Sequence, residues 1–334
     1  MDFKRILIVK LSSIGDVVHT LPALSALRKR FPKSYIAWVV KKQIANIIIG
    51  HPHLDEVITY EGPKKTAKKL RSLKFDLAID FQGLFRSGFL TFISGAKTRF
   101  GFSRANSREL SRLFVNQRIT PGKEDRHIID KNLSLLRPLG IEVREKEFII
   151  PVFRENREHI TSFLKERKII SSDILIALHP GASWPSKLWP EEKWVELVDR
   201  LIEELKVKAI LLWGPEDKNS IDRIAKMTEN RPIISCKTNL KELTCLISKC
   251  RLFIGGETGP LHIACALNIP TIALIGPTDS IRNGPYGEGH IVIEKDLPCR
   301  GCWRHKCKRL DCMKSITVGE VFSAVKEQLR ARRV

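Results

Sequence analysis

An aspartate lies in a short polar loop near the start of the chain, within the stretch Lys10–Pro22. The apolar run before this loop, Ile6–Val9, is typical of a buried parallel strand, and apolar side chains recur with helical spacing after it. Parallel α/β sheets place ligand sites at such strand-to-helix loops. Asp16 could therefore act as a base, or it could cap the helix by accepting a backbone N–H bond.

The same loop excludes two common nucleotide-binding motifs. It contains Ser12, Ser13 and Gly15, but no Gly-Lys-Ser/Thr sequence follows, so it is not a Walker loop. Its single glycine also excludes the dinucleotide-binding fingerprint. The case for chemistry at Asp16 therefore depends on the rest of the chain.

Polar residues also follow predicted strands in the second half. Lys187 lies just before a predicted helix that begins with Pro190, where its ammonium and the free N–H groups of the first turn could bind phosphate. Glu216 follows the predicted strand Val207–Trp213 and could accept hydrogen bonds from ribose hydroxyls. Each also has a structural alternative: a solvated surface lysine, and a first-turn glutamate that complements the helix dipole.

The stretch Phe253–His262 contains the densest group of such residues. Its two glycines allow a ligand to approach the backbone closely, and Glu257, Thr258 and Gly259 precede a helix that we predict to begin at Pro260. A further polar loop closes the next predicted strand. Several polar loops at one sheet edge, two of them leading into helices, predict a site for a nucleotide that carries a diphosphate.

Strand-like and helix-like segments alternate along the whole chain, interrupted by a polar, charged stretch at about 151–172. This alternation predicts an α/β protein with two doubly wound parallel sheets that face each other across a cleft. We place the domains at residues 1–155 and 156–334. The C-terminal amphipathic helix Val318–Arg330 either completes the second domain or packs back on the first.

The chain has 334 residues, with 58 Lys and Arg against 37 Asp and Glu, a formal net charge of +21. Such an excess is typical of proteins with acidic partners: nucleic acid, anionic lipid headgroups or phosphorylated substrates. Because no RNA-binding motif or zinc finger accompanies it, a membrane-surface enzyme with an anionic substrate explains the charge as well as nucleic acid does. No apolar run approaches the roughly 20 residues of a membrane span, so we expect a soluble intracellular protein.

The eight cysteines fall into two groups. Four lie in apolar contexts and are expected to be buried: Cys236, Cys245, Cys250 and Cys265. Four cluster in a basic segment near the C-terminus: Cys299, Cys302, Cys307 and Cys312. The first pair of this second group has zinc-like spacing, whereas the later spacings are irregular. Free thiols, a disulfide and a bound metal stay open for it, and we assign no metal site and no catalytic role.

Taken in order, the motifs resemble the lipopolysaccharide heptosyltransferases, glycosyltransferase family 9. The matching motifs span nearly the whole chain: Lys10–Leu24, Asp80–Leu84, Lys187–Trp194, Trp213–Gly214, Glu257–His262 and Gly276–Thr278. The first motif is nearest to the type I branch of the family. The resemblance implies a GT-B fold with two Rossmann-like domains, in which the first holds the acceptor and the second holds ADP-heptose.

The resemblance also implies a reaction: an inverting transfer of L-glycero-D-manno-heptose from ADP-heptose to a Kdo residue of Kdo2-lipid A, without a cofactor or an obligatory metal. It gives Asp16 the role of general base toward the acceptor hydroxyl. Lys187 and the helix start at Thr258–Gly259 would stabilise the charge that develops on the leaving diphosphate. The donor-binding residues expected on this basis are Ser183, Glu216, Glu257, Thr258, Gly259 and His262. Glu257 departs from the family pattern, which frequently has aspartate there.

The first half would bind the lipopolysaccharide acceptor. The acceptor-binding residues expected there are Ser12, Ser13, Gly15, Lys64, Arg86 and Arg118. Some basic side chains would meet Kdo carboxylates and lipid A phosphates, and others would hold the enzyme on the anionic cytoplasmic face of the inner membrane, each contributing about 1 kcal/mol. For any single basic residue, a solvated surface position is the alternative. We expect no nucleic acid partner.

Other functions stay open at this point. A related transferase could add heptose to another core position or use another activated sugar. A sugar-nucleotide epimerase of similar fold would bind a nucleotide sugar without any lipid acceptor. A non-catalytic nucleic-acid-binding protein has only the basic charge in its favour.

Overall fold

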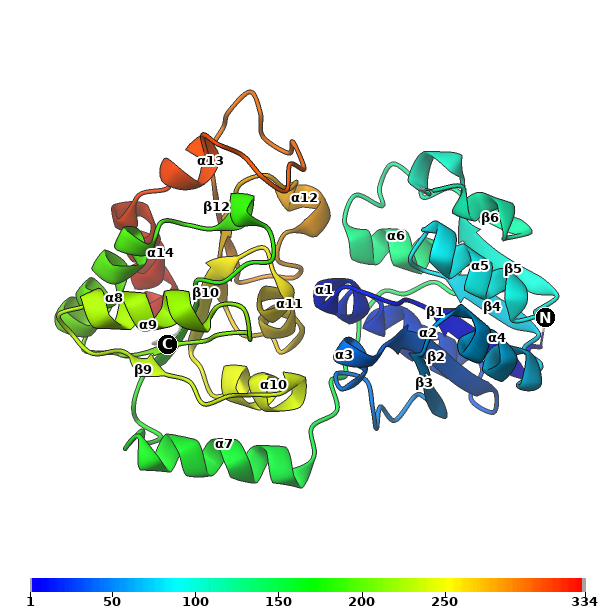
Figure 1. Ribbon diagram of the computed structural model, residues 1–334, viewed down its shortest axis with the longest axis horizontal. Helices are drawn as coiled ribbons and strands as arrows, with labels where there is room; N and C mark the ends of the chain where they lie inside the picture. Colours follow the sequence, from blue (N-terminus) through cyan, green and yellow to red (C-terminus); the bar gives the residue numbers. More distant parts are fainter. Residues whose placement is uncertain (1, 108, 332–334) are drawn as a thin grey trace. The chain divides into compact units, whose positions relative to one another are not determined.

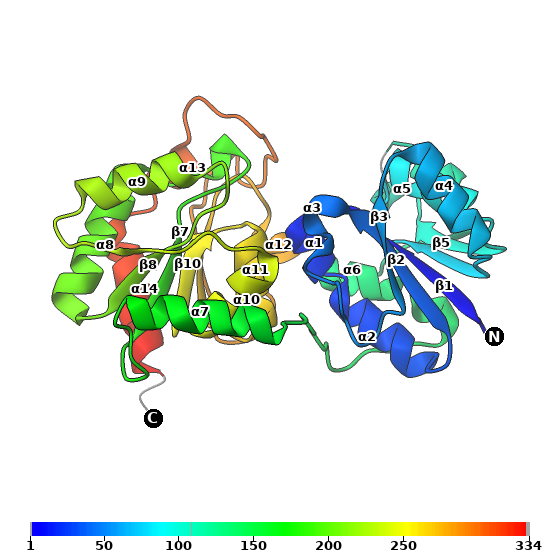
Figure 2. The same ribbon diagram turned by 60° about the horizontal axis from the view of Figure 1, so that its bottom comes forward.

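The structure is a computed structural model that describes residues 2–107 and 109–331 (Figure 1). The chain divides into two compact units, with the boundary between Pro151 and Val152. The polar stretch in the sequence predicts a boundary four residues later. Each unit contains a six-stranded sheet in which the paired strands are parallel, with helices packed on the sheet, as the alternating sequence pattern predicts (Figure 2).

The first sheet has the strand order β3-β2-β1-β4-β5-β6. Its strands are β1 (Arg5–Val9), β2 (Tyr35–Lys41), β3 (Glu56–Tyr60), β4 (Leu77–Asp80), β5 (Thr98–Phe102) and β6 (Gln117–Ile119). The helices of this unit are α1 (Ile14–Val18), α2 (Leu21–Arg30), α3 (Lys42–Ala45), α4 (Pro63–Ser72), α5 (Phe85–Ile93) and α6 (Ile128–Ser134). Single 3₁₀ turns are η1 (Arg104–Asn106), η2 (Ser111–Leu113) and η3 (Arg137–Leu139).

The second sheet has the strand order β12-β11-β10-β7-β8-β9. Its strands are β7 (Leu175–His179), β8 (Lys208–Leu211), β9 (Ile233–Ile234), β10 (Leu252–Gly256), β11 (Thr271–Ile275) and β12 (Ile291–Glu294). The longer helices are α7 (Arg154–Glu166), α8 (Glu191–Leu205), α9 (Lys218–Met227), α10 (Leu240–Ser248), α11 (Gly259–Ala266) and α14 (Val318–Arg330). Shorter elements are η4 (Pro185–Lys187), α12 (Ser280–Asn283) and α13 (Asp311–Lys314).

The central strands have apolar side chains on both faces because helices cover both faces of each sheet. In β1, the run Ile6–Val9 is fully buried and pairs with β2 and β4. The second unit has its own apolar core, to which α14 contributes Val321, Phe322 and Val325. The buried face of the C-terminal helix thus packs within the second unit, against α8, β11 and β12.

Two predicted helices of the first unit differ from the structure. The apolar spacing from Val17 to Phe31 predicts one helix, but the helix breaks after Val18 and α2 begins at Leu21, with a proline in its first turn. The sequence also predicts a helix near 104–115. This segment instead holds two 3₁₀ turns, and Glu109 and Leu110 between them have left-handed backbone conformations that a continuous helix does not allow.

The structure also bears on membrane crossing. Within residues 2–107 and 109–331, no helix has both the length and the hydropathy that crossing a bilayer requires.

Candidate active site

Both groups of predicted site residues follow strands at the centre of a sheet. In each sheet the order of strand addition reverses between two neighbours, β1 and β4 in the first unit and β7 and β10 in the second. Ligands of open α/β sheets bind at the carboxyl ends of the strands at such a reversal. The loop that carries Asp16 follows β1, and Glu257 follows β10. Each unit therefore places its predicted residues where its fold favours a ligand.

Asp16 is the third residue of α1, and Ser13 is the N-cap. Asp16 Oδ2 accepts hydrogen bonds from the Ser13 backbone N–H at 2.9 Å and from the Ser13 hydroxyl at 3.0 Å. The expected N-cap role is therefore wrong in position: Asp16 reaches back to the cap residue, as the third residue of a capping box does. This hydrogen bonding fixes the direction of a carboxylate that is 34% exposed.

Besides the Ser13 hydrogen bonds, an ion pair with Lys10 holds the Asp16 carboxylate. The Lys10 side chain is only 3% exposed, and its ammonium lies 3.3 Å from Asp16 Oδ1 and donates to the Phe81 carbonyl at 3.0 Å. Burial raises the pKa of Asp16, but the Lys10 charge and the Ser13 hydrogen bonds lower it by more, so the pKa lies below its usual value. Asp16 is therefore an ionised, oriented and solvent-accessible carboxylate at neutral pH.

The loop after β4 holds the Asp16 loop in place. Gln82 Oε1 accepts hydrogen bonds from the backbone N–H groups of Leu11 and Ser12, at 3.0 and 3.2 Å. Asp80, which is buried, shapes the β4 loop by accepting from the N–H groups of Gln82 and Gly83. Burial raises the pKa of Asp80 to about 6 despite these bonds. The matched motif Asp80–Leu84 thus explains the position of the β1 loop, although no site role was predicted for it.

The predicted acceptor residues lie in two places. Ser12, Ser13 and Gly15 belong to the Asp16 loop. Lys64 is the second residue of α4, just beyond the carboxyl end of β3, and it is exposed. Arg86 follows β4 and packs over the ring of Tyr60, the last residue of β3, with 5.5 Å between the guanidinium carbon and the ring centre. These two cations therefore lie toward the sheet edge that carries Asp16.

Arg118 differs from the other predicted acceptor residues. It is an exposed residue inside the edge strand β6, where its Nε donates to the Arg112 carbonyl at 3.1 Å. Its position within a strand, three strands from β1 in the sheet, separates it from the loop of Asp16.

In the second unit, Glu257 lies between the two other charged or titratable residues that the sequence predicts. Its carboxylate pairs with the Lys187 ammonium, which also donates to the Glu257 carbonyl at 3.0 Å. The other carboxylate oxygen lies 3.1 Å from His262 Nε2. Burial raises the pKa of Glu257, but His262 and Lys187 lower it by more. The structure therefore brings these three residues into one group, in which Glu257 is paired with both Lys187 and His262.

A buried histidine joins this group without having been predicted. His179, at the end of β7, lies with Nδ1 3.4 Å from the hydroxyl of Thr258, the N-cap of α11. Burial lowers the pKa of His179 to about 4, so it is neutral at pH 7. Asp217 lies close to Gly181: a Cβ atom added to Gly181 would lie 2.3 Å from the carboxyl carbon of Asp217. The sequence signal was the His179–Ser183 loop itself, at a strand end.

The remaining donor predictions lie around this centre. Gly259 is the first residue of α11, one residue before the start predicted from Pro260. Ser183 is exposed in the loop between β7 and η4. Glu216 is exposed in the turn before α9, one residue before the helix N-cap Asp217. Of the two acidic residues in this turn, Asp217 rather than Glu216 faces the β7 loop.

The segment Cys299–Cys312 packs against the same loops. Trp184 stacks on His305, with 3.8 Å between ring centres, and the Lys187 ammonium lies 4.5 Å from the centre of the Trp184 ring. The Trp303 backbone N–H donates to the Pro277 carbonyl at 2.8 Å. All eight cysteines are free thiols in the structure, and no group of three ligands suited to a metal is found among the described residues.

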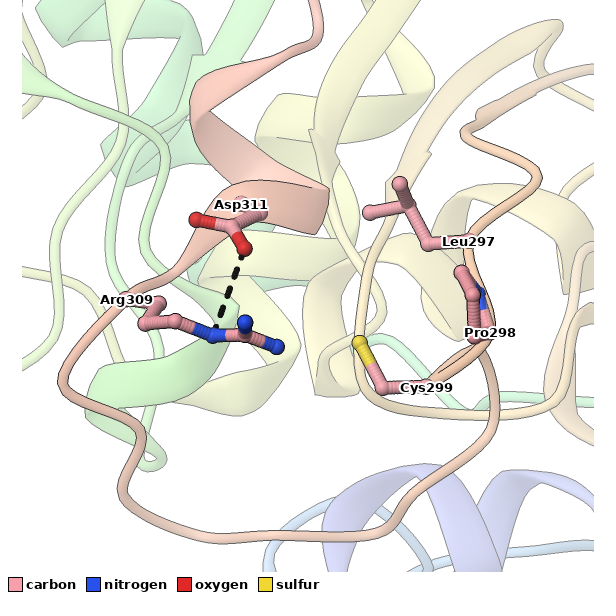
Figure 3. A pocket seen from close by; sticks show the side chains of 5 residues that line it. All are labelled: Leu297, Pro298, Cys299, Arg309 and Asp311. Atoms are coloured by element: carbon pink, nitrogen blue, oxygen red, sulfur yellow. Dashed lines mark ion pairs between the residues drawn. The ribbon is translucent and has the colours of Figure 1, made fainter.

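The segment also bounds a hollow of its own. Figure 3 shows Leu297, Pro298 and Cys299 on one side, and Arg309 and Asp311 on the other. Arg309 Nε lies 3.4 Å from Asp311 Oδ2. None of the predicted site residues lines this hollow, so it is distinct from the Lys187–Glu257–His262 group.

Comparison with known proteins agrees with this arrangement. Lipopolysaccharide heptosyltransferase 1 of Pseudomonas aeruginosa is 28% identical over 324 residues, which cover 91% of this chain and 87% of the relative. A glycosyltransferase family 9 structure from Veillonella parvula superimposes with a TM-score of 0.87 at 25% identity, covering 99% and 98% of the two chains. E. coli heptosyltransferase WaaC with ADP-2-deoxy-2-fluoro heptose gives 0.74 at 25% identity, covering 97% and 99%.

The two-sheet architecture is accordingly the GT-B fold expected from the sequence. The family model for glycosyltransferase family 9 (heptosyltransferase) matches residues 64–313, which is more than half of the chain. The chain therefore belongs to glycosyltransferase family 9, the heptosyltransferases, and is a glycosyltransferase.

Proposed function

We propose that this protein transfers L-glycero-D-manno-heptose from ADP-heptose to a Kdo residue of Kdo2-lipid A, with inversion at the anomeric carbon. The observation that carries the proposal is the Asp16 carboxylate, which is ionised, accessible and oriented by Lys10 and Ser13 at the reversal point of the first sheet. The similarity to a lipopolysaccharide heptosyltransferase 1 supports the choice of acceptor and donor.

In the proposed step, the acceptor hydroxyl attacks the anomeric carbon from the face opposite the diphosphate. Its proton passes to Asp16 as the new C–O bond forms, and the bond from the anomeric carbon to the diphosphate oxygen breaks, releasing ADP. The lowered pKa of Asp16 keeps the base ionised before the reaction. Proton transfer then becomes favourable as the attacking oxygen acquires positive charge, and a positioned base contributes roughly 10²- to 10⁴-fold.

The second unit would hold the donor. The Lys187 ammonium has three N–H donors, and within the residues that the structure describes it donates to the Glu257 carbonyl and carboxylate. One donor is thus left for a diphosphate oxygen. The first-turn N–H groups of α11, beginning at Gly259, supply further partial positive charge. Together they would stabilise the charge that develops on the leaving group.

The acceptor carries carboxylates and phosphates, which fits the basic first unit. Lys64 and Arg86 lie toward the sheet edge of Asp16 and are the candidates for these groups. Arg118 is the weaker candidate because it lies inside the edge strand β6. The same proposal places the enzyme at the cytoplasmic face of the inner membrane, where its acceptor would be presented.

The test is an incubation of the purified protein with ADP-heptose and Kdo2-lipid A, followed by mass spectrometry of the lipid. We expect a mass gain of one heptose and release of ADP. Transfer to a lipid that already carries heptose, but not to Kdo2-lipid A, would point to another core position. Transfer of a different sugar would revise the donor. Isomerisation of a nucleotide sugar without acceptor, or DNA binding without transfer, would refute the proposal.

A further inference from the structure

Helix α5 leaves two large aromatic side chains outside the core. Its buried side chains are those of Ser87, Leu90 and Thr91. Gly88 packs closely against Ser111 and Phe114 of the neighbouring segment. Phe85 and Phe92, in contrast, are 51% and 52% exposed. A helix that covers a sheet normally buries its large apolar residues. The outward phenylalanines of α5 therefore have no role in the core of the unit.

The segment after β5 extends this apolar surface. Leu110 precedes η2 and is 56% exposed, and Leu113 is the last residue of η2 and is 59% exposed. We call the four exposed residues Phe85, Phe92, Leu110 and Leu113 the apolar patch. The four residues belong to neighbouring segments, because α5 packs directly on η2. Large apolar side chains that are exposed together in this way commonly mark an interaction site.

The aromatic rings of the patch are ordered by one another. The half-buried Phe114 lies under them, with its ring centre 5.1 Å from that of Phe85 and 6.2 Å from that of Phe92. Phe89 lies one turn along α5, parallel to Phe85 and 6.0 Å from Phe114. The patch is thus a pre-formed surface that needs no rearrangement to present its rings.

Cationic residues lie at the patch: Arg112 is part of η2, and Arg99 packs on a ring of α5. Arg99 lies over the Phe92 ring at 5.4 Å and is held there by hydrogen bonds to the carbonyls of Phe114 and Ala96. From Leu84 to Ile119 the sequence contains Arg86, Lys97, Arg99, Arg104, Arg108, Arg112 and Arg118. Glu109 is the single acidic residue in this stretch.

We propose that the apolar patch docks this protein on a lipid bilayer that contains anionic headgroups. The phenylalanines and leucines would enter the boundary between headgroups and acyl chains, and the arginines at the patch would contact lipid phosphates. This inference rests on the proposed function, because a lipid-linked acceptor has to be reached at a membrane.

Two other occupants fit the patch less well. A second copy of the chain would bring the same cationic residues face to face, which opposes association. Single-stranded nucleic acid stacks its bases on separate aromatic rings. Here Phe85, Phe89 and Phe92 all contact Phe114, and the neighbouring leucines offer no flat face for a base. An anionic bilayer uses both the apolar side chains and the cationic residues.

The test is co-sedimentation of the full chain with phosphatidylethanolamine vesicles, with or without phosphatidylglycerol. We expect binding to the vesicles with phosphatidylglycerol, and a loss of roughly tenfold or more in the partition coefficient for the double variant Phe85→Ser/Phe92→Ser. The matched control is Ile170→Ser/Met227→Ser, which removes two residues of the second unit that are 63% and 53% exposed. The control should bind like the wild type.

Circular dichroism and thermal melting check that the variants fold. If Phe85→Ser/Phe92→Ser does not fold, Leu110→Ser/Leu113→Ser decides instead, since these side chains are the most exposed of the patch. Equal vesicle binding by wild type and patch variant would overturn the proposal. It would also be overturned by a dimer in sedimentation equilibrium that the patch substitutions dissociate, or by RNA binding that they abolish.

Transfer to an acceptor stripped of its acyl chains separates this proposal from the proposed function. The patch variant should retain wild-type turnover on this soluble acceptor, because the patch contains none of the residues placed in the reaction. Vesicle binding through the patch without heptose transfer by the wild type would leave the docking surface standing and remove the proposed function. Heptose transfer by the wild type without patch-dependent vesicle binding would support the proposed function and remove the docking surface.

Discussion

Asp16 combines a structural and a proposed chemical role because its two oxygens have different partners. Oδ2 accepts from Ser13 and completes the start of α1, while Oδ1 faces the Lys10 ammonium. From sequence alone, a cap and a base are competing interpretations of the same aspartate. The structure makes them compatible, since the capping contacts hold the carboxylate in one orientation while leaving it accessible.

Asp16→Asn separates the two roles. The amide oxygen can still accept the Ser13 N–H bond, but the buried Lys10 ammonium loses its charged partner. We therefore expect a stability loss of roughly 1–3 kcal/mol by thermal or denaturant unfolding, with the fold retained. Turnover should fall about 100-fold or more because an amide cannot take the acceptor proton. The affinity for ADP, measured by calorimetry, should stay within about twofold of the wild-type value. Near-normal turnover in this variant would return Asp16 to a capping role alone.

Lys10→Met tests the electrostatic role of the buried ammonium. Without it, the pKa of Asp16 should rise, because the largest contribution that lowers this pKa is removed. The acid limb of the profile of kcat/KM against pH should therefore move to higher pH. A lowered pKa in the folded state also stabilises the fold above the unfolded pKa, and this contribution is lost as pH falls through the folded value. An unshifted acid limb, in a variant that melts normally, would contradict the assignment.

Lys187 and Glu257 allow a double-mutant test at the donor site. Lys187→Met leaves a carboxylate that is only 9% exposed with His262 as its remaining charged partner, so unfolding free energy should fall by roughly 2–4 kcal/mol. Adding Glu257→Gln should restore most of that stability, since no charge is then left buried. ADP affinity should stay about tenfold or more below wild type in both variants, because neither has the ammonium. Recovery of affinity with stability would show that Lys187 acts only structurally.

At the scale of elements, the loops after β7 and β11 are linked by a segment that the sequence left without a role. Trp184 stacks on His305 and contacts the Lys187 ammonium, and the Trp303 backbone N–H donates to the Pro277 carbonyl. The segment Cys299–Cys312 thus supports a wall of the proposed donor site rather than extending away from it. Its cysteines contribute to this only through the fold of the segment that carries them.

Trp184→Ala should consequently act on the donor and not on the chemical step. Loss of the ring removes the stacking on His305 and so loosens this wall of the donor site, whereas the Lys187 ammonium is still held by Glu257. We expect the KM for ADP-heptose to rise about fivefold or more while kcat stays within about twofold, because Asp16 lies in the other unit. Steady-state kinetics with each substrate varied in turn will measure both. A fall in kcat at unchanged KM would contradict this role.

Elements with a strong local pattern were predictable from the sequence, and elements that depend on distant partners were not. β4, β5, α4 and α14 have the predicted bounds because apolar runs, a proline start or a capping threonine define them locally. β6, β9 and β12 were missed, since these two- to four-residue strands depend on pairing with a neighbour. The burial of Lys10 was likewise hidden, because its partner Phe81 is 71 positions away.

At the scale of the whole molecule, positive charge is concentrated in one unit. Residues 1–151 contain 28 Lys and Arg against 14 Asp and Glu, so +14 of the net +21 belongs to the first unit. The second unit, which carries the Lys187–Glu257–His262 group, has the more balanced composition. The proposed acceptor is polyanionic, whereas the donor meets a compact and largely buried ion pair.

This difference predicts an unequal response to salt. Raising ionic strength from about 0.05 to about 0.5 M shortens the Debye length from roughly 14 Å to roughly 4 Å and screens the first unit's exposed cations. The KM for an acceptor without acyl chains should rise about fivefold or more, while the KM for ADP-heptose should change less than about twofold, because short contacts to partly buried groups are screened least. Sucrose in place of salt serves as the control for viscosity and solvent effects. Equal increases in both KM values would mean that the charge of the first unit does not select the acceptor.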